Sequence, residues 1–159
     1  MRGALIGVIT VVSAAMLVGS GSLASASVRP ALSGTEYIHE VTTSFSTDQA
    51  PVIINGAVTA GGVDVSHSLF KFATGTITVV IKPTSQTEHT TKSCLITSYE
   101  RGTFTFTGGT GNYAGISGSG DFNASTLIIL AVNSEGECNA EAGPVAGEIV
   151  ITGRGHVKL

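Results

Sequence analysis

The sequence predicts an all-β protein, a single antiparallel β-barrel of about eight strands, with a two-sheet sandwich as the alternative. Thr, Val and Ile are abundant along the chain, and these β-branched residues pack better on a pleated sheet than in a helix. Short runs of them are separated by glycine- and asparagine-containing clusters that are typical of turns. No amphipathic helical pattern follows the N-terminal segment.

The first 26 residues have the features of a secretory signal peptide. Arg2 precedes an almost uncharged apolar run at residues 4–18, and residues 24–26 match an A-x-A cleavage signal. The run is shorter than the roughly 20 apolar residues that span a bilayer, which favours cleavage over a membrane anchor. We therefore expect a secreted, extracellular protein with a flexible N-terminal tail at residues 27–34 and a barrel domain at residues 35–159.

Length and charge restrict the classes of function. Cleavage leaves 133 of the 159 residues, which is enough for one domain and too few for two. The net charge of the whole chain is −3, and loss of Arg2 makes the mature chain one unit more negative. An acidic chain without a basic cluster is a poor partner for nucleic acid and for an anionic membrane surface. We expect no nucleic-acid partner, and no membrane contact after cleavage of the signal peptide.

The two cysteines, Cys94 and Cys138, both belong to the mature chain. An even number of cysteines in an exported protein indicates a disulfide, and two cysteines allow a single pairing. Neither has a histidine at a spacing that would indicate a catalytic or metal-binding thiol. The sequence therefore predicts a structural Cys94–Cys138 bridge.

Nine runs with strand-like composition follow the tail. They are residues 36–45, 52–59, 63–72, 76–82, 90–99, 102–107, 113–122, 127–132 and 145–158. Phe104 and Phe106 alternate with threonines, which is the period-2 pattern of a half-buried antiparallel strand. Pro83 is expected to end the run that begins at Thr76, because proline donates no hydrogen bond to a neighbouring strand.

The stretch FTFTGGTGNYAGISGSGDF, residues 104–122, matches the G-x-G-x-x-A form of a dinucleotide-binding fingerprint from Gly109 onward. That fingerprint requires a helix after the glycines, whose N-terminal amides hold a pyrophosphate. Three further glycines lie where the helix would run, and each costs about 1 kcal/mol relative to alanine. The helix is therefore excluded, and we expect no nucleotide cofactor.

A glycine-rich hairpin explains the same residues. Gly108 and Gly109 permit a turn with positive φ, and Gly111 suits a bulge or a second turn position. Tyr113 can cover a barrel end or enter the core, and small residues on the returning strand let another backbone approach closely. The glycines with this predicted structural role are Gly108, Gly109, Gly111, Gly115, Gly118 and Gly120.

Residues 104–122 resemble the glycine-rich hairpin of the allene oxide cyclase and dirigent superfamily, and more closely that of small secreted actinobacterial proteins of unassigned role. The resemblance implies an eight-stranded antiparallel barrel, often trimeric or dimeric, with an apolar cavity for a lipid-like or phenolic ligand. The cyclases isomerise a fatty-acid epoxide, and dirigent proteins steer the coupling of phenoxy radicals. The catalytic acids of the family do not align with this chain residue by residue, so no catalytic residue is assigned.

A few polar side chains are candidates for ligand binding. Glu36, His39 and Glu40 fall on one predicted strand, where the two glutamates share a face with Ile38. They could place two carboxylates in a cavity for acid–base work, but we favour an exposed, charged edge strand. The remaining candidates are Tyr99 and Tyr113.

No metal site is predicted. The four histidines are scattered without the short spacings of a zinc site, and the glutamates around Cys138 lack the spacing of a calcium loop.

We therefore expect a non-catalytic secreted β-barrel that binds a small apolar or aromatic ligand, or an extracellular surface. The alternatives are a dirigent-like or cyclase-like isomerase without metal or nucleotide cofactor, and a structural or interaction protein of the cell envelope that forms homo-oligomers.

Overall fold

A computed structural model describes residues 32–43 and 49–159. The predicted signal peptide and most of the predicted tail lie outside these residues. The described part contains eight strands: β1 (Ser33–Thr42), β2 (Gln49–Gly56), β3 (Ala60–Val65), β4 (Leu69–Phe72), β5 (Gly75–Thr90), β6 (Leu95–Gly109), β7 (Ser117–Val132) and β8 (Cys138–Lys158). A short 3₁₀ turn, η1 (Gly111–Tyr113), connects β6 to β7.

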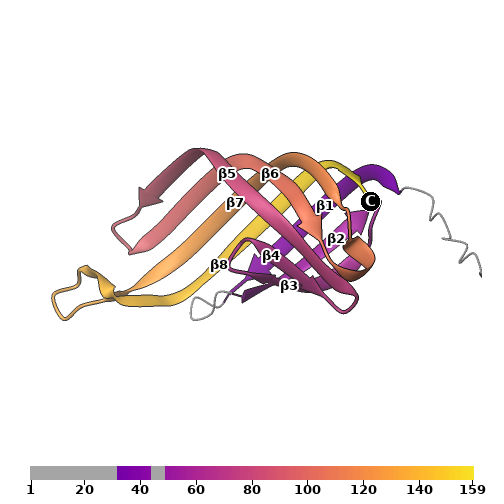
Figure 1. Ribbon diagram of the computed structural model, residues 1–159. Helices are drawn as coiled ribbons and strands as arrows, with labels where there is room; N and C mark the ends of the chain where they lie inside the picture. Colours follow the sequence, from indigo (N-terminus) through magenta and orange to yellow (C-terminus); the bar gives the residue numbers. More distant parts are fainter. Residues whose placement is uncertain (1–31, 44–48) are drawn as a thin grey trace, which may run out of the picture.

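The eight strands form one antiparallel sheet that closes on itself (Figure 1). Each strand pairs with the next along the chain, and β8 pairs with β1 over ten residue pairs from Ser33–Lys158 to Thr42–Ile149. The predicted all-β barrel is confirmed. The sandwich alternative is wrong, because the closing β1–β8 ladder makes one continuous sheet.

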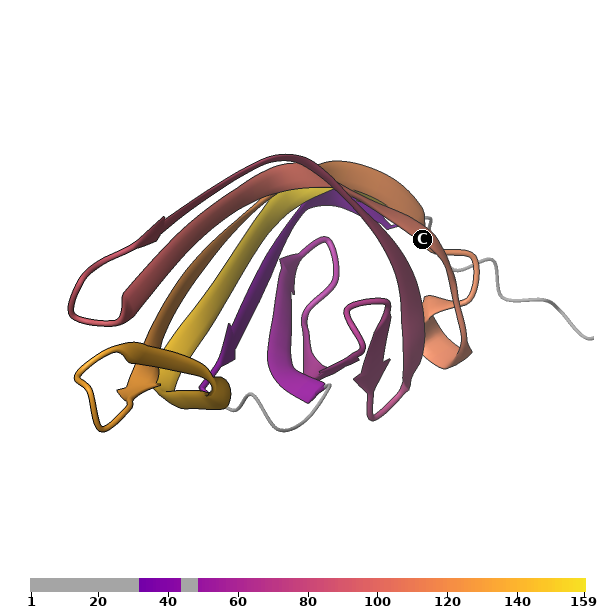
Figure 2. The same cartoon turned by 90° about the vertical axis from the view of Figure 1, so that its left-hand side faces the viewer.

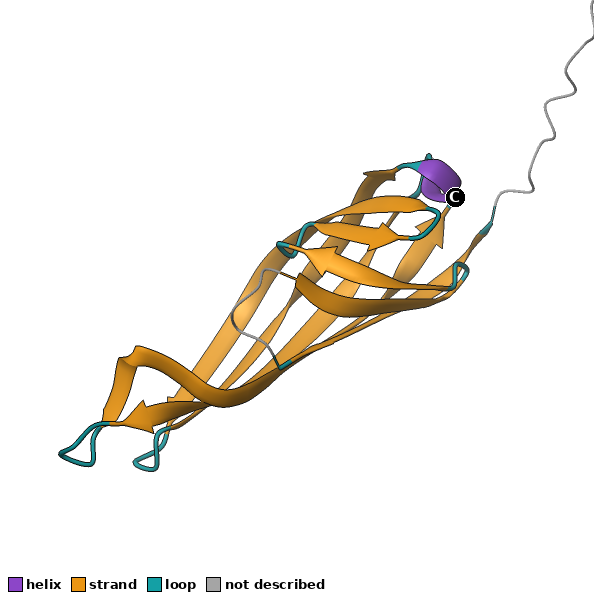
Figure 3. Cartoon of the chain, turned by 90° about the horizontal axis from the view of Figure 1, so that it is seen from below, coloured by secondary structure: helices purple, strands orange, loops and turns teal. Residues whose placement is uncertain are grey.

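The strands differ in length, and this difference shapes the molecule. β1 to β4 have 10, 8, 6 and 4 residues, whereas β5 to β8 have 16, 15, 16 and 21. The surplus of the longer strands projects from one end of the barrel as a four-stranded sheet (Figures 1 and 3). We call this sheet the extension. It comprises residues 85–90, 95–101, 123–132 and 138–150, of which only 149 and 150 pair with β1.

The long strands are continuous where the sequence predicted breaks. Pro83 does not end β5, because the β5–β6 register shifts between Pro83 and Ser85, and a bulge tolerates a residue without an N–H donor. The runs predicted at 90–99 and 102–107 join in β6 from Leu95 onward, whereas Thr90 ends β5 and residues 91–94 form the turn between the two strands. Conversely, the run predicted at 63–72 divides into β3 and β4.

The core lies inside the barrel and consists of buried residues from every strand except β3, together with η1 and the turn after it; β3 adds the partly buried Ala60. Phe104 and Phe106 on β6 are each 2% exposed, as their alternation with threonine predicted. The Phe106 ring meets Phe70 edge-on, with ring centroids 6.2 Å apart. Burial of each such side chain contributes about 1.5–3 kcal/mol relative to exposure.

The connection after β6 corrects the predicted glycine turn. β6 continues through Gly109, so the turn lies at residues 110–116 rather than at Gly108 and Gly109. Gly111 has φ +59°, and a Cβ there would collide with the backbone oxygen of Thr74. Gly120 approaches β8 so closely that a Cβ would collide with the Arg154 backbone oxygen, which confirms the predicted close approach of backbones.

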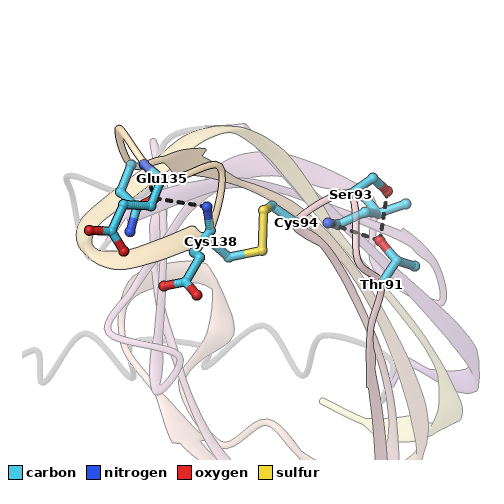
Figure 4. Close-up of a disulfide and its surroundings, with 8 residues drawn as sticks. Thr91, Ser93, Cys94, Glu135 and Cys138 are labelled. Atoms are coloured by element: carbon cyan, nitrogen blue, oxygen red, sulfur yellow. Dashed lines mark hydrogen bonds between the residues drawn. A yellow bond between two sulfur atoms is a disulfide. The ribbon is translucent and has the colours of Figure 1, made fainter.

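The predicted disulfide is present at the far end of the extension (Figure 4). Cys94, in the β5–β6 turn, bonds to Cys138 at the start of β8, and their Cα atoms lie 5.2 Å apart. The bridge therefore ties the β5–β6 turn to the start of β8; both strands reach the end of the extension, which faces the viewer in Figure 2.

Candidate functional site

The barrel interior is filled by side chains. A void among its core residues measures about 20 Å³ and is lined mainly by apolar residues such as Ile38, Phe104 and Phe122, together with Glu40. This volume accommodates about one water molecule. This void has no room for a lipid-like or phenolic molecule of the kind that the family resemblance implies.

Three carboxylates nevertheless lie inside the barrel. Glu36 and Glu40 on β1 are 1% and 3% exposed, and Asp64 on β3 is 1% exposed. Our preferred interpretation of the two glutamates as an exposed edge strand is wrong, because β1 pairs with both β2 and β8 and has no free edge. Alternation along β1 turns them inward together with Ile38.

Glu36 lies near the barrel end opposite the extension. Its Oε2 accepts a hydrogen bond from the Val58 backbone N–H at 2.9 Å, and its Oε1 makes no hydrogen bond. Burial raises the pKa of Glu36 above its ordinary value of 4.5, against a smaller lowering by backbone N–H groups.

Glu40 and Asp64 lie side by side at the barrel end from which the extension projects, and His67 lies above them. The His67 Nδ1 is 3.4 Å from Asp64 Oδ2 and 3.8 Å from Glu40 Oε1. Burial, followed by repulsion from Asp64, raises the pKa of Glu40 to about 8. Burial also raises the pKa of Asp64. We call these three residues the acidic cluster.

The turn between β3 and β4 positions His67. The Ser68 N–H donates to the Val65 carbonyl at 3.3 Å, and the two central residues, Ser66 and His67, have φ of 56° and 54°. These are the positive φ values of a type I′ hairpin turn, which normally favours Asn and Gly. The tight turn places the imidazole over the barrel end, where it contacts the two carboxylates and remains partly exposed to solvent.

Sequence reasoning missed Asp64 and His67, and it predicted no metal site. Alternation within Val63-Asp64-Val65 suggests valines inside and the aspartate outside, whereas Val63 is 36% exposed and Asp64 is buried. The three members of the cluster come from β1, β3 and a turn, so their spacing in the sequence does not indicate a shared site. Their ligand atoms all lie within 4.8 Å of one another.

A second feature, a groove of about 510 Å³, lies on the extension. Eight of its eleven lining residues form two rows across β5 to β8, defined by strand pairing: His89, Thr97, Leu127 and Glu148 in one row, and Thr87, Tyr99, Ser125 and Val150 in the other. Tyr99 is an odd number of positions from buried Phe104, so it faces the opposite side of the sheet. The groove, which we call the outer groove, therefore lies on the outer face.

The predicted ligand-binding residues do not converge on one site. Glu40 belongs to the acidic cluster, and Glu36 lies near the opposite end of the barrel. His39 is exposed on the outside of β1, and Tyr99 lies in the outer groove. Tyr113 is a core residue, 5% exposed, whose ring lies 5.1 Å from that of Phe72.

None of the protein-family models, curated proteins or solved structures compared with this chain matches it. Within residues 32–43 and 49–159, no helix is both long and apolar enough to cross a membrane.

Proposed function

We propose that the protein is a secreted, non-catalytic binding protein whose ligand site is the outer groove. The observation that carries this proposal is the contrast in free volume. The outer groove measures about 510 Å³, within the range of about 300–1,000 Å³ that is usual for small-molecule sites, whereas the barrel interior has about 20 Å³.

The chemistry of the groove favours a small amphipathic ligand with an apolar or aromatic face. Tyr99 and Leu127 are 37% and 44% exposed and lie diagonally in adjacent rows. Hydroxyl side chains surround them, and His89 and Glu148 stand at opposite ends of one row. Such an arrangement of apolar centre and polar rim is typical of ligand sites.

The Tyr99 ring is held in place before any ligand arrives. Its hydroxyl donates to Asn123 Oδ1 at 2.9 Å and accepts from Arg101 Nε at 3.0 Å. The Arg101 guanidinium also lies 4.9 Å from the centre of the ring. A fixed aromatic surface loses less conformational entropy on binding, which supports Tyr99 as the contact for an aromatic ligand.

An isomerase is a second candidate, and the buried Glu40–Asp64 pair favours it. A carboxyl with a pKa of about 8 can deliver or accept a proton near neutral pH. Because the void beside Glu40 holds about one water, the substrate of such an enzyme would have to react at the barrel end, beneath His67.

Titration with two aromatic amphiphiles, anilinonaphthalene sulfonate and ferulic acid, tests the proposed binding site. Leu127→Asp places a charge in the centre of the groove and is expected to weaken binding about tenfold or more, which corresponds to about 1.4 kcal/mol. Ile53→Asp is the matched control, because Ile53 is 54% exposed on β2, outside the extension.

Equal weakening by both substitutions, or binding that neither substitution alters, would rule out the outer groove as the site. Binding of a second copy of the chain instead, seen as concentration-dependent dimers that Leu127→Asp dissociates, would favour the interaction-protein alternative.

A further inference from the structure

We infer that Glu40, Asp64 and His67 form a binding site for a divalent transition-metal cation of the Zn²⁺ type. This site goes beyond the proposed function, because it lies inside the barrel end whereas the outer groove lies on the opposite face of the sheet. Its donors are two carboxylate oxygens and one imidazole nitrogen, all within 4.8 Å of one another.

The spacing of the donors fits one shared cation. Bonds of about 2.0–2.2 Å to a tetrahedral zinc place neighbouring ligand atoms about 3.3–3.6 Å apart. His67 Nδ1 lies 3.4 Å from Asp64 Oδ2 and 3.8 Å from Glu40 Oε1. The separation from Asp64 falls within this range, and the separation from Glu40 is slightly longer. Both exceed the 2.7–3.2 Å of an ordinary N–H···O hydrogen bond, which leaves space for an ion between the groups.

The buried oxygens independently indicate a missing partner. Glu40 Oε1 and both carboxylate oxygens of Asp64 are buried and make no hydrogen bond of good geometry, although the two residues are 3% and 1% exposed. Buried carboxylates without partners are costly. Among the described residues, His67 is the one basic group within ion-pair distance of either carboxylate. A divalent cation would give these buried oxygens a partner.

Access and ligand type narrow the identity of the ion. The His67 side chain is 60% exposed, so an ion can enter from solvent and keep water at a fourth position, as in zinc sites with three protein ligands. Imidazole is a preferred ligand of zinc and its neighbours in the periodic table, whereas calcium and magnesium prefer sites made of oxygen alone.

Isothermal titration of ZnCl₂ into the mature chain, stripped of metal and freed of any affinity tag, tests this inference. We expect one Zn²⁺ per chain. His67→Ala and Asp64→Asn should each weaken binding at least about tenfold, an effect that even an outer-shell partner of a metal ligand can have. His67→Ala is decisive, because this exposed turn residue does not support the core, and circular dichroism confirms that each variant folds.

Two matched controls separate the cluster from adventitious binding. Glu36→Gln removes a buried carboxylate elsewhere in the same barrel, and His39→Ala removes an exposed histidine on the same strand as Glu40. Both should bind Zn²⁺ like the wild type, and Co²⁺ should show the visible absorption of a four-coordinate site that His67→Ala abolishes.

Three results would overturn the inference. The first is no saturable Zn²⁺ binding up to about 1 mM, and the second is binding that His67→Ala and Asp64→Asn leave unchanged. The third is tighter binding of Ca²⁺ or Mg²⁺ than of Zn²⁺, which would contradict a role for imidazole. Because the outer groove shares no residue with the cluster, failure here leaves the groove titrations unaffected.

Discussion

The barrel and the extension share strands β5 to β8, but only the barrel encloses a core. Within the barrel, inward-facing side chains of β5 to β8 meet those of β1 to β4 and form a core with a void of about 20 Å³. In the extension, the same four strands have no opposing sheet in the described part of the chain, and inward-facing residues such as Ile96 and Ile128 are only half-buried. Alternation therefore produces a core only where the sheet curls far enough to meet itself.

The two regions are also stabilised by different interactions. Burial of apolar surface stabilises the barrel, whereas cross-strand hydrogen bonds and the Cys94–Cys138 bridge restrain the extension. Each region also contains one of the two candidate binding sites. The acidic cluster uses buried charges at the barrel end, and the outer groove uses exposed side chains on the extension.

The largest expected effect comes from truncating one large apolar residue in the barrel and one in the extension. Phe104→Ala should lower the unfolding free energy by about 3–5 kcal/mol, because it leaves a cavity in the core. Leu127→Ala, at an exposed position on the extension, should change it by about 0.5 kcal/mol or less. Urea denaturation of both variants measures the two values. Similar losses would show that the extension packs against something as firmly as the barrel does.

Removal of the disulfide should act mainly on the extension. The bridge spans a sequence separation of 44 residues, for which chain entropy gives about 4 kcal/mol. The double variant Cys94→Ala/Cys138→Ala should lose up to this amount, and limited proteolysis should cut first within residues 85–101 or 125–148. First cleavage in β1 to β3 would contradict a separately restrained extension.

A smaller effect is expected from pH, and it should originate in the barrel. Because burial raises the pKa of Glu36 above 4.5, the folded chain holds this proton more tightly than the unfolded chain. The resulting stability is complete below about pH 4.5 and is lost as the pH rises through the raised pKa.

Glu36→Gln keeps an oxygen for the Val58 N–H and cannot ionise, so its unfolding free energy should fall less steeply with rising pH than that of the wild type. Urea denaturation at about pH 4, 6 and 8 measures the slope. A residual slope is expected because Glu40 has a pKa of about 8. Identical slopes for the wild type and Glu36→Gln would show that Glu36 ionises equally easily in the folded and unfolded chains.

Local patterns predicted most of the fold. Alternation at Phe104 and Phe106 identified an inward face, and the cysteine count identified the bridge. The glycines after Thr107 excluded a helix, and residues 117–120 do form the start of β7. Pro83 misled the prediction because a bulge, which depends on the neighbouring strand, accommodates it.

The candidate sites were far less predictable. The spacing of Glu36 and Glu40 placed them on one face of a strand, but whether that face was the inside depended on both neighbours of β1. Asp64 faces the interior although valines flank it. A turn with two positive φ values places His67 beside it.

The amino-acid sequence alone determined that the chain is all-β, that its two cysteines pair, and that residues 104–122 run as a hairpin rather than a cofactor-binding helix. These properties follow from preferences of single residues and their nearest neighbours along the chain. The tertiary structure alone decided that side chains fill the barrel, that β5 to β8 extend beyond β1 to β4, and that Glu40, Asp64 and His67 lie together. Such features depend on how far strands distant in sequence overlap, and no local preference encodes that overlap.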